Sequence, residues 1–95
     1  KLMKRSAYLI NTSRGPIVDE NALIEVLNQG YIAGAGLDVF DSEPMGMKHP
    51  LILSERTTIT PHIGYVTQET YEVFFEDTLE CVLSYINGTL VRLIN

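Results

Sequence analysis

Three positions in the sequence carry side chains that could together perform acid–base chemistry on a small anion. They are Arg14 in the string NTSRGPIVDE, the acidic run from Asp38 to Glu43, and His62 in the string TITPHIG. The planar guanidinium of an arginine suits a carboxylate. An imidazole exchanges a proton near neutral pH, and a neighbouring carboxylate orients it. Each residue alone is more often a solvated loop side chain, but the three types together indicate a site for an anionic substrate and one proton transfer.

Each of these positions lies at or just after the end of a segment that we expect to be a strand. Residues 6–11 (SAYLIN) and 32–40 (IAGAGLDVF) are apolar, β-favouring runs, and we expect the first to be buried. We expect the glycines of the second run to let that strand pack closely against a helix. Residues 57–60 (TTIT) form a third short run that ends at Pro61.

Two helical patterns separate and follow these strands. Apolar residues recur at helical spacing in residues 20–30 (ENALIEVLNQG), and residues 67–88 have the pattern of a long amphipathic helix that stops at Gly88. Strands that alternate with helices predict an α/β fold with a parallel sheet and right-handed crossovers. Ligands bind at the carboxyl ends of the strands in such sheets, which is where the three polar positions fall.

Composition excludes several classes of partner. The chain has 95 residues and a formal net charge of −5, with no basic stripe to neutralise phosphates, so we expect no binding to nucleic acid. We see no targeting segment and no apolar run near 18 residues, the length that a membrane span needs, so we expect no membrane association. The single cysteine, Cys81, forms neither an internal disulfide nor a cysteine-based zinc site. We therefore expect a cytoplasmic protein.

The strings YLINTSRGPIVDENALIEVLNQGYIAGAGLDVFDSEP and TITPHIG closely resemble part of a known enzyme family. They resemble the carboxyl-terminal part of the cofactor-binding domain of the D-isomer-specific 2-hydroxyacid dehydrogenases, over residues 3 to about 70. The family includes D-lactate, D-3-phosphoglycerate and glycerate or hydroxypyruvate enzymes. The resemblance implies the carboxyl-terminal half of a Rossmann-like doubly wound parallel sheet plus a long terminal helix. It divides the chain into a partial NAD(P)-binding domain, residues 1–66, and a helix with a tail, residues 67–95, that returns toward an absent substrate domain.

The resemblance also implies which residues handle the substrate. Arg14 would bind the substrate carboxylate and carbonyl. His62 would give a proton to the substrate oxygen or take one from it, and Glu43 would be the hydrogen-bonded partner of His62. The implied reaction is a D-specific hydride transfer between NAD(P) and a small 2-hydroxy or 2-oxo acid.

The resemblance assigns three further residues to the cofactor. Asp38 would contact the nicotinamide carboxamide, and Thr12 and Gly64 would line the cofactor. The implied cofactor is NAD, with NADP as the alternative, because the residue that reads the ribose 2′ position does not occur in this sequence.

The sequence also departs from the family pattern. The phosphate-binding string G-x-G-x-x-G is missing, since GAGLDV has Gly34 and Gly36 but Val39 in the third glycine position. We therefore interpret the chain as a carboxyl-terminal fragment that is inactive alone. A cut sheet and a helix without its neighbour would leave apolar surface exposed, so we expect self-association, for example as a homodimer.

Other functions remain as alternatives. The main one is a non-catalytic α/β interaction module in which residues 67–88 dock a partner through their apolar stripe, although core packing in a longer protein explains that stripe more easily. Two further alternatives have the right residue types without the usual spacing. One is a metal site formed by His49, His62, Asp38 and Glu43. The other is a hydrolase triad formed by Ser13, His62 and Asp19. Neither has a helical ligand pair or a nucleophile elbow, so we predict no metal.

Overall fold

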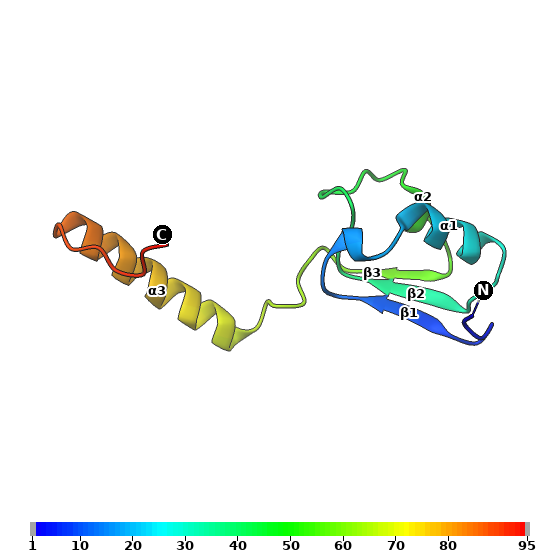
Figure 1. Cartoon of the computed structure of the whole chain (residues 1–95), viewed down its shortest axis with the longest axis horizontal. Coiled ribbons are helices and arrows are strands. Elements are labelled where there is room, and N and C mark those ends of the chain that lie inside the picture. Colours follow the sequence, from blue (N-terminus) through cyan, green and yellow to red (C-terminus); the bar gives the residue numbers. More distant parts are fainter. Residues whose placement is uncertain (1, 95) are drawn as a thin grey trace. The chain divides into compact units, whose positions relative to one another are not determined.

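A parallel sheet organises the amino-terminal part of the computed structural model, which describes residues 2–94 (Figure 1). Strands β1 (Tyr8–Asn11), β2 (Gly34–Leu37) and β3 (Thr57–Ile59) lie in the order β1-β2-β3. Both pairings are parallel, with Tyr8 opposite Gly34 and Ala35 opposite Thr57. The predicted parallel α/β fold is therefore confirmed, and the strands are shorter than the apolar runs that indicated them.

A side-chain contact marks the start of the first long helix, and a glycine with positive φ follows its end. Helix α1 (Glu20–Asn28) starts after Asp19, whose carboxylate accepts a hydrogen bond of 3.0 Å from the amide of Ala22. This contact satisfies an amide that has no partner inside the helix. Gly30 follows the end of α1 with a φ of 65°, a backbone conformation that glycine adopts without steric cost.

Two short helices were not predicted from the sequence. They are the 3₁₀ helix η1 (Gly15–Ile17) and helix α2 (Pro50–Leu53). Each is about one turn long, so neither shows a repeated apolar period. Helix α2 begins after His49, whose Nδ1 accepts a hydrogen bond of 3.3 Å from the amide of Leu51.

The core lies between the sheet and the helices that cover one of its faces, α1 and α2 (Figure 1). Its buried members are Leu23 and Leu27 from α1, Ala35 and Leu37 from β2, Leu51 from α2, and Ile32 and Phe40 from the segments that flank β2. Burial of these side chains is what fixes the strand ends relative to α1.

The opposite face of the sheet is open within residues 2–94. Tyr8 and Ile10 of β1 are 68% and 67% exposed, so the prediction that the first strand is buried is wrong for the described chain. The glycines of β2 pack against neighbouring strands instead of a helix. A Cβ on Gly34 would lie 2.6 Å from the carbonyl oxygen of Arg56, and one on Gly36 would lie 2.8 Å from Cδ1 of Ile10.

The chain divides into two compact units, Lys1–Gly64 and Tyr65–Asn95, which we describe separately. The second unit consists mainly of helix α3 (Gln68–Ile86), which agrees with the predicted long helix. It begins after Thr67, whose hydroxyl accepts a hydrogen bond of 3.2 Å from the amide of Thr70, and it ends before Gly88 with a φ of 73°. Its caps therefore match the sequence signals that predicted them.

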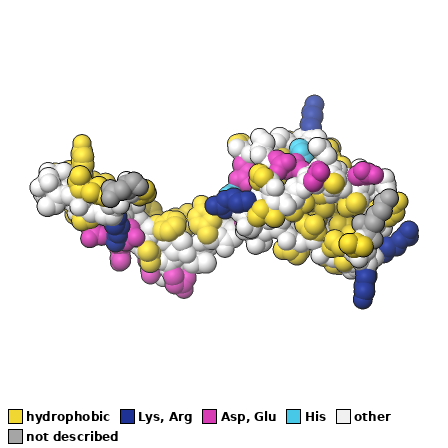
Figure 2. All heavy atoms as spheres, in the orientation of Figure 1, with side chains coloured by type: hydrophobic (Ala, Val, Ile, Leu, Met, Phe, Trp, Pro, Cys, Tyr) yellow, Lys and Arg dark blue, Asp and Glu magenta, His cyan; other side chains and the backbone are white. Residues whose placement is uncertain are grey.

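The apolar stripe of α3 is exposed in the second unit. No residue of α3 is buried, and Phe74, Phe75 and Leu79 are among its exposed apolar side chains. Figure 2 shows hydrophobic side chains on the surface of this unit. The tail folds back through Arg92, whose guanidinium lies 2.7 Å from Asp77 and 2.8 Å from Glu80. None of the helices within residues 2–94 combines the length and the apolar character that a membrane crossing requires.

Candidate functional site

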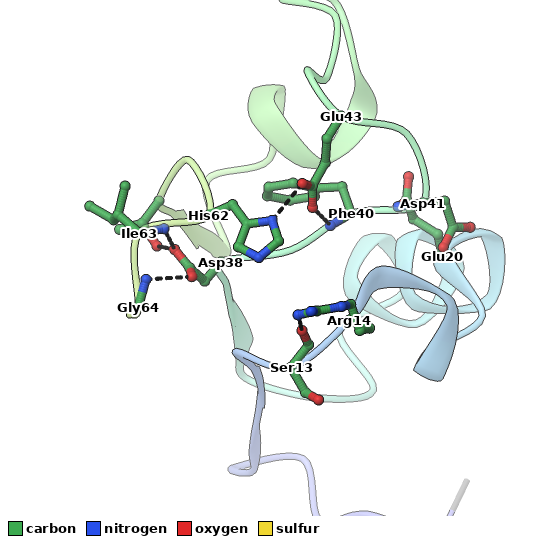
Figure 3. Close-up of polar contacts among 11 residues, drawn as sticks. Ser13, Arg14, Glu20, Asp38, Phe40, Asp41, Glu43, His62, Ile63 and Gly64 are labelled. Atoms are coloured by element: carbon green, nitrogen blue, oxygen red, sulfur yellow. Dashed lines mark hydrogen bonds and ion pairs between the residues drawn. The ribbon is translucent and has the colours of Figure 1, made fainter. Parts of the chain in front are cut away.

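The carboxyl ends of the three strands meet at one edge of the sheet, because the strands are parallel. Thr12 and Arg14 follow β1, Asp38 follows β2, and the turn that contains His62 and Gly64 follows β3. Figure 3 shows the polar residues of this edge and the contacts between them. The structure thus gathers residues from segments that are far apart in the sequence.

Glu43 and His62 contact each other at this edge. Oε2 of Glu43 lies 2.6 Å from Nδ1 of His62, and each side chain is 34% exposed. The other oxygen of Glu43, Oε1, accepts a hydrogen bond of 2.9 Å from the amide of Phe40. The carboxylate is therefore held on one side by the backbone and holds the imidazole on the other (Figure 3).

These contacts change the ionisation of Glu43. The hydrogen bond from His62 lowers the pKa of the Glu43 carboxyl, and the Phe40 amide and the positive charge of Arg14 lower it further. The carboxyl is thus ionised at neutral pH. A carboxylate so close to Nδ1 fixes the orientation of the ring and leaves proton exchange to Nε2.

Asp38 organises the turn after β3. Its carboxylate is buried and accepts hydrogen bonds from the hydroxyl of Thr60, from the amide of Ile63 at 2.9 Å and from the amide of Gly64 at 2.8 Å. The bond from Thr60 and the amide bonds lower the pKa of Asp38 and outweigh the effect of burial, which would raise it. Asp38 is consequently ionised and connects the end of β2 to the turn.

That turn gives His62 an unusual backbone. Its φ of 57° lies in the left-handed region, which is uncommon for a residue other than glycine. The amides of the next two residues, Ile63 and Gly64, are the ones that Asp38 binds. The buried carboxylate therefore stabilises the conformation that directs His62 toward Glu43.

Arg14 is exposed, and its backbone is fixed more firmly than its side chain. Its Nη1 donates a hydrogen bond of 2.7 Å to the carbonyl of Ser13. Its own carbonyl accepts a bond of 2.9 Å from the side chain of Asn11, which is buried. Gly15 then packs directly on the backbone of Phe40, since a Cβ there would lie 2.0 Å from the Phe40 carbonyl carbon.

Asn11 and Gly15 thus position the connection that carries Arg14, although sequence reasoning did not select them. Asn11 could have been selected from the sequence because it is a polar residue at the last position of an apolar strand.

In each of the two rival constellations, at least one residue is engaged elsewhere, although His62 and Glu43 of the metal constellation do contact each other. His49 lies 2.9 Å from Glu20, and Asp19 caps α1. In the part of the chain that the structure describes, no three His, Cys, Asp or Glu side chains are grouped so that they could hold a metal ion.

A pocket of about 320 Å³ borders the pair formed by Glu43 and His62. Its lining residues are Phe40, Glu43, Pro44, Pro61 and His62. The walls are mainly apolar, so a small organic molecule could bind there next to the imidazole.

Among the residues that the resemblance assigns to a nicotinamide cofactor, Asp38 has an acceptor whose chemistry would suit the carboxamide end. Thr12, Asp38 and Gly64 follow three adjacent strands, where dinucleotides bind in sheets of this kind. A carboxylate oxygen accepts two hydrogen bonds, and among residues 2–94 Oδ2 of Asp38 receives the one from Gly64. This leaves Oδ2 able to accept a second bond from an amide group such as the carboxamide.

Comparisons with known proteins identify the family to which the chain is similar. Residues 1–64 match the family described as D-isomer specific 2-hydroxyacid dehydrogenase, NAD binding domain. The chain is 42% identical over 88 residues to a glyoxylate reductase from Thermofilum pendens, covering 93% of this chain and 26% of that protein. It is 43% identical over 90 residues to a glyoxylate/hydroxypyruvate reductase B from an Enterobacter species, covering 95% of this chain and 28% of that protein.

Solved structures show the same similarity. An oxidoreductase from Ralstonia solanacearum superimposes with a TM-score of 0.89 at 39% identity, covering 98% of this chain and 27% of that chain. A D-isomer specific 2-hydroxyacid dehydrogenase from Lactobacillus delbrueckii ssp. bulgaricus, in an NAD complexed form, gives a TM-score of 0.72 at 34% identity and covers 98% and 32%. The chain thus spans between about a quarter and a third of the length of these four proteins. The family model, the fold and the strand-end residues together establish that this chain belongs to the D-isomer-specific 2-hydroxyacid dehydrogenase family.

Proposed function

We propose that the complete protein containing this chain is an NAD(P)-dependent oxidoreductase that interconverts a small D-2-hydroxy acid and the corresponding 2-oxo acid. The observation that carries the proposal is the 2.6 Å contact between His62 and Glu43 at the strand-end edge that also carries Arg14. Membership of the family supports the same conclusion. Because the chain spans about a quarter of its curated relatives, we assign the activity to the complete protein and expect none from residues 1–95 alone.

The proposed roles follow from the chemistry of the side chains. Arg14 binds the substrate carboxylate and carbonyl through its planar guanidinium, which offers two parallel donors. His62 exchanges a proton with the substrate oxygen through Nε2, while Glu43 holds Nδ1 and stabilises the imidazolium when it forms. The pocket beside Glu43 and His62 is the proposed place of the substrate.

NAD(P), when bound, supplies a carbon that accepts or donates hydride. Asp38, Thr12 and Gly64 are the residues proposed to hold its nicotinamide end. NAD is the first candidate because the matching family domain is an NAD-binding domain, and NADP is the alternative. The cytoplasm is the proposed location, since reduced dinucleotides and a single unpaired cysteine both suit a reducing compartment.

The names of the relatives select the first substrates to test. Glyoxylate and hydroxypyruvate are small 2-oxo acids, and reductases of these acids are similar to the chain over more than nine-tenths of its length. The test is oxidation of NADH and NADPH by the complete protein in the presence of each acid, before and after the substitution His62→Asn.

We expect turnover of at least one acid, and a loss of about 100-fold or more in kcat for His62→Asn with cofactor affinity retained. Absence of turnover with every 2-oxo acid, or full activity of His62→Asn, would contradict the proposed function.

One observation favours a second function. Within residues 2–94, no residue of α3 is buried. An exposed apolar helix of this kind would suit an interaction module that docks a partner or a second copy of the chain through α3. Catalysis that depends on His62 would exclude a purely non-catalytic module.

A further inference from the structure

The carboxylate of Glu20, which has no proposed role in catalysis or cofactor binding, contacts both ends of the segment that carries Glu43. Oε1 of Glu20 lies 2.9 Å from Nε2 of His49, and Oε2 accepts a hydrogen bond of 3.0 Å from the amide of Asp41. Residues 41–49 form a loop without helix or strand. A single side chain in the first turn of α1 therefore holds the loop where it leaves the sheet and where it enters α2.

The His49 ring is oriented for this contact. Its Nδ1 accepts the amide hydrogen of Leu51, so the neutral ring carries its proton on Nε2 and donates it to Glu20. The side chains of His49 and Glu20 are 27% and 16% exposed, so they are largely shielded from water. Glu20 also lies at the amino end of α1, where the helix dipole favours a negative charge.

The start of the loop is held from a second side. Gly15 packs against the backbone of Phe40 and Asp41, and a Cβ there would lie 2.5 Å from the Asp41 amide nitrogen. Figure 3 shows Glu20, Asp41 and Glu43 around this stretch. The Asp41 amide is therefore confined between Gly15 and Glu20, two residues before Glu43.

We propose that Glu20, together with His49, is a positioning residue for Glu43: by holding both ends of residues 41–49, Glu20 fixes the place at which Glu43 meets His62. The inference rests on the proposed function only where it calls the contact between Glu43 and His62 a part of catalysis. The geometric part, that the contact depends on Glu20, stands independently.

The experiment uses the chain of residues 1–95 and compares Glu20→Gln with Glu25→Gln. Glutamine at position 20 keeps the size of the side chain but replaces one carboxylate oxygen with an amide NH₂ donor. This donor faces another donor, either Nε2 of His49 or the amide of Asp41, so one of the two contacts is lost. Glu25 is the matched control, since it lies on the same helix and its side chain accepts a hydrogen bond of 3.0 Å from exposed Gln29.

The main readout is the carboxyl ¹³C titration of Glu43 in the folded chain. Because unfolding would also raise the pKa of Glu43, the titration is read only over the pH range in which circular dichroism shows that the variant stays folded. In the native chain the pKa of Glu43 lies below the ordinary value because of the contact with His62. We expect Glu20→Gln to raise the pKa of Glu43 toward the ordinary value and Glu25→Gln to leave it unchanged. An unchanged titration of Glu43 in Glu20→Gln would overturn the inference.

Amide hydrogen exchange provides a second readout. The Phe40 amide, which donates to Glu43, should exchange about tenfold faster in Glu20→Gln, as expected for the weakening of a bond to a charged acceptor. The Ala22 amide, which donates to Asp19, should keep its rate and so report that α1 still forms. Should Glu20→Gln fail to fold, His49→Ala removes one of the two anchors and must show the same shift of Glu43.

The same substitutions in the complete protein separate this inference from the proposed function. We expect Glu20→Gln to lower kcat severalfold with little change in the KM for the cofactor. A protein without hydride transfer, but with the expected shift of Glu43, would refute the function and leave the positioning role intact. An active enzyme in which Glu20→Gln changes neither kcat nor the Glu43 titration would refute only the positioning role.

Discussion

Glu43 connects the backbone at Phe40 to the imidazole of His62 with its two oxygens. Because the pKa of its carboxyl is lowered in the folded chain, ionisation of Glu43 is linked to folding. Arg14 acts on the same group at longer range through its charge. The chemistry proposed for the site therefore depends on a few side chains whose individual contributions can be measured.

The pH dependence of stability provides the first prediction. The lowered pKa of Glu43 means that its contribution to the free energy of unfolding is complete above its ordinary pKa of 4.5 and is lost as the pH falls through the folded value. We expect urea unfolding of residues 1–95 to show a weaker loss of stability between neutral pH and about pH 3 in Glu43→Gln than in the native chain. Equal pH slopes in the two proteins would show that the contact with His62 does not persist in solution.

The guanidinium of Arg14 gives the second prediction. In the complete protein, Arg14→Lys keeps the charge but loses the planar pair of donors, so kcat/KM for a 2-oxo acid should fall by about 100-fold. Cofactor affinity should stay the same. Arg56→Lys, at the opposite end of the sheet, is the matched control and should retain activity. Parallel losses of cofactor affinity and turnover would place Arg14 at the nucleotide instead of the substrate.

At the scale of elements, the site depends on close contacts between strand-end connections. Gly15, after β1, packs on the backbone after β2, and Asp38, after β2, binds the turn after β3. These contacts run across the sheet edge in sequence from β1 to β3. Each connection is thus positioned by its neighbour.

Gly15→Ala tests this arrangement. A methyl group would lie 2.0 Å from the carbonyl carbon of Phe40, so the two connections must move apart. We expect the free energy of unfolding to fall by about 3 kcal/mol or more, the upper range for overpacking a tight contact. Gly46→Ala is the control, because a Cβ at Gly46 meets no atom within 4 Å, and it should change stability by less than about 0.5 kcal/mol. Similar values for both variants would contradict the tight packing at Gly15.

The sequence predicted the helices whose apolar residues recur at regular spacing, and it predicted the polar residues at the strand ends. Helices α1 and α3 were predicted because their caps and apolar spacing are local signals. The parallel pairing of the strands was predicted from the alternation of strands and helices. Contacts that form only in three dimensions were missed: the packing of Gly15 on Phe40, and the buried Asn11 that holds the carbonyl of Arg14. Burial of β1 was predicted wrongly, since an apolar run does not reveal whether each face of its strand is covered.

At the scale of the whole molecule, the described chain has two uncovered apolar surfaces. One is the face of the sheet with Tyr8 and Ile10, and the other is the stripe of α3. Isolated copies can remove either surface from water by association. A complete protein could cover the same surfaces with its own further segments.

We therefore predict that residues 1–95 self-associate in solution, which light scattering would detect. Phe75→Glu places a charge on the exposed stripe of α3 and should weaken the association by about tenfold. Gln68→Glu adds the same charge at the amino end of α3 and serves as the control, with no expected effect. A monomeric native chain would contradict the prediction.

The chain alone should also bind dinucleotide poorly. The glycine-rich phosphate loop, which provides much of the recognition in this class of sheet, does not occur in the sequence. Titration calorimetry of residues 1–95 with NADH should therefore give a Kd weaker than about 1 mM. Tight binding would show that the strand-end residues hold the cofactor without the phosphate contacts.

The positions of Arg14, Glu43 and His62 along the chain have a consequence for how such a site is inherited. All three fall in a single continuous stretch of one compact unit, and the groups that orient them, Asp38 and Glu20, fall in it too. Recombination of genes that exchanges this stretch as one block would carry together the residues proposed for catalysis and the residues that position them. Under the proposed function, substrate range would then diversify through other parts of the protein while the residues proposed for proton transfer stayed together.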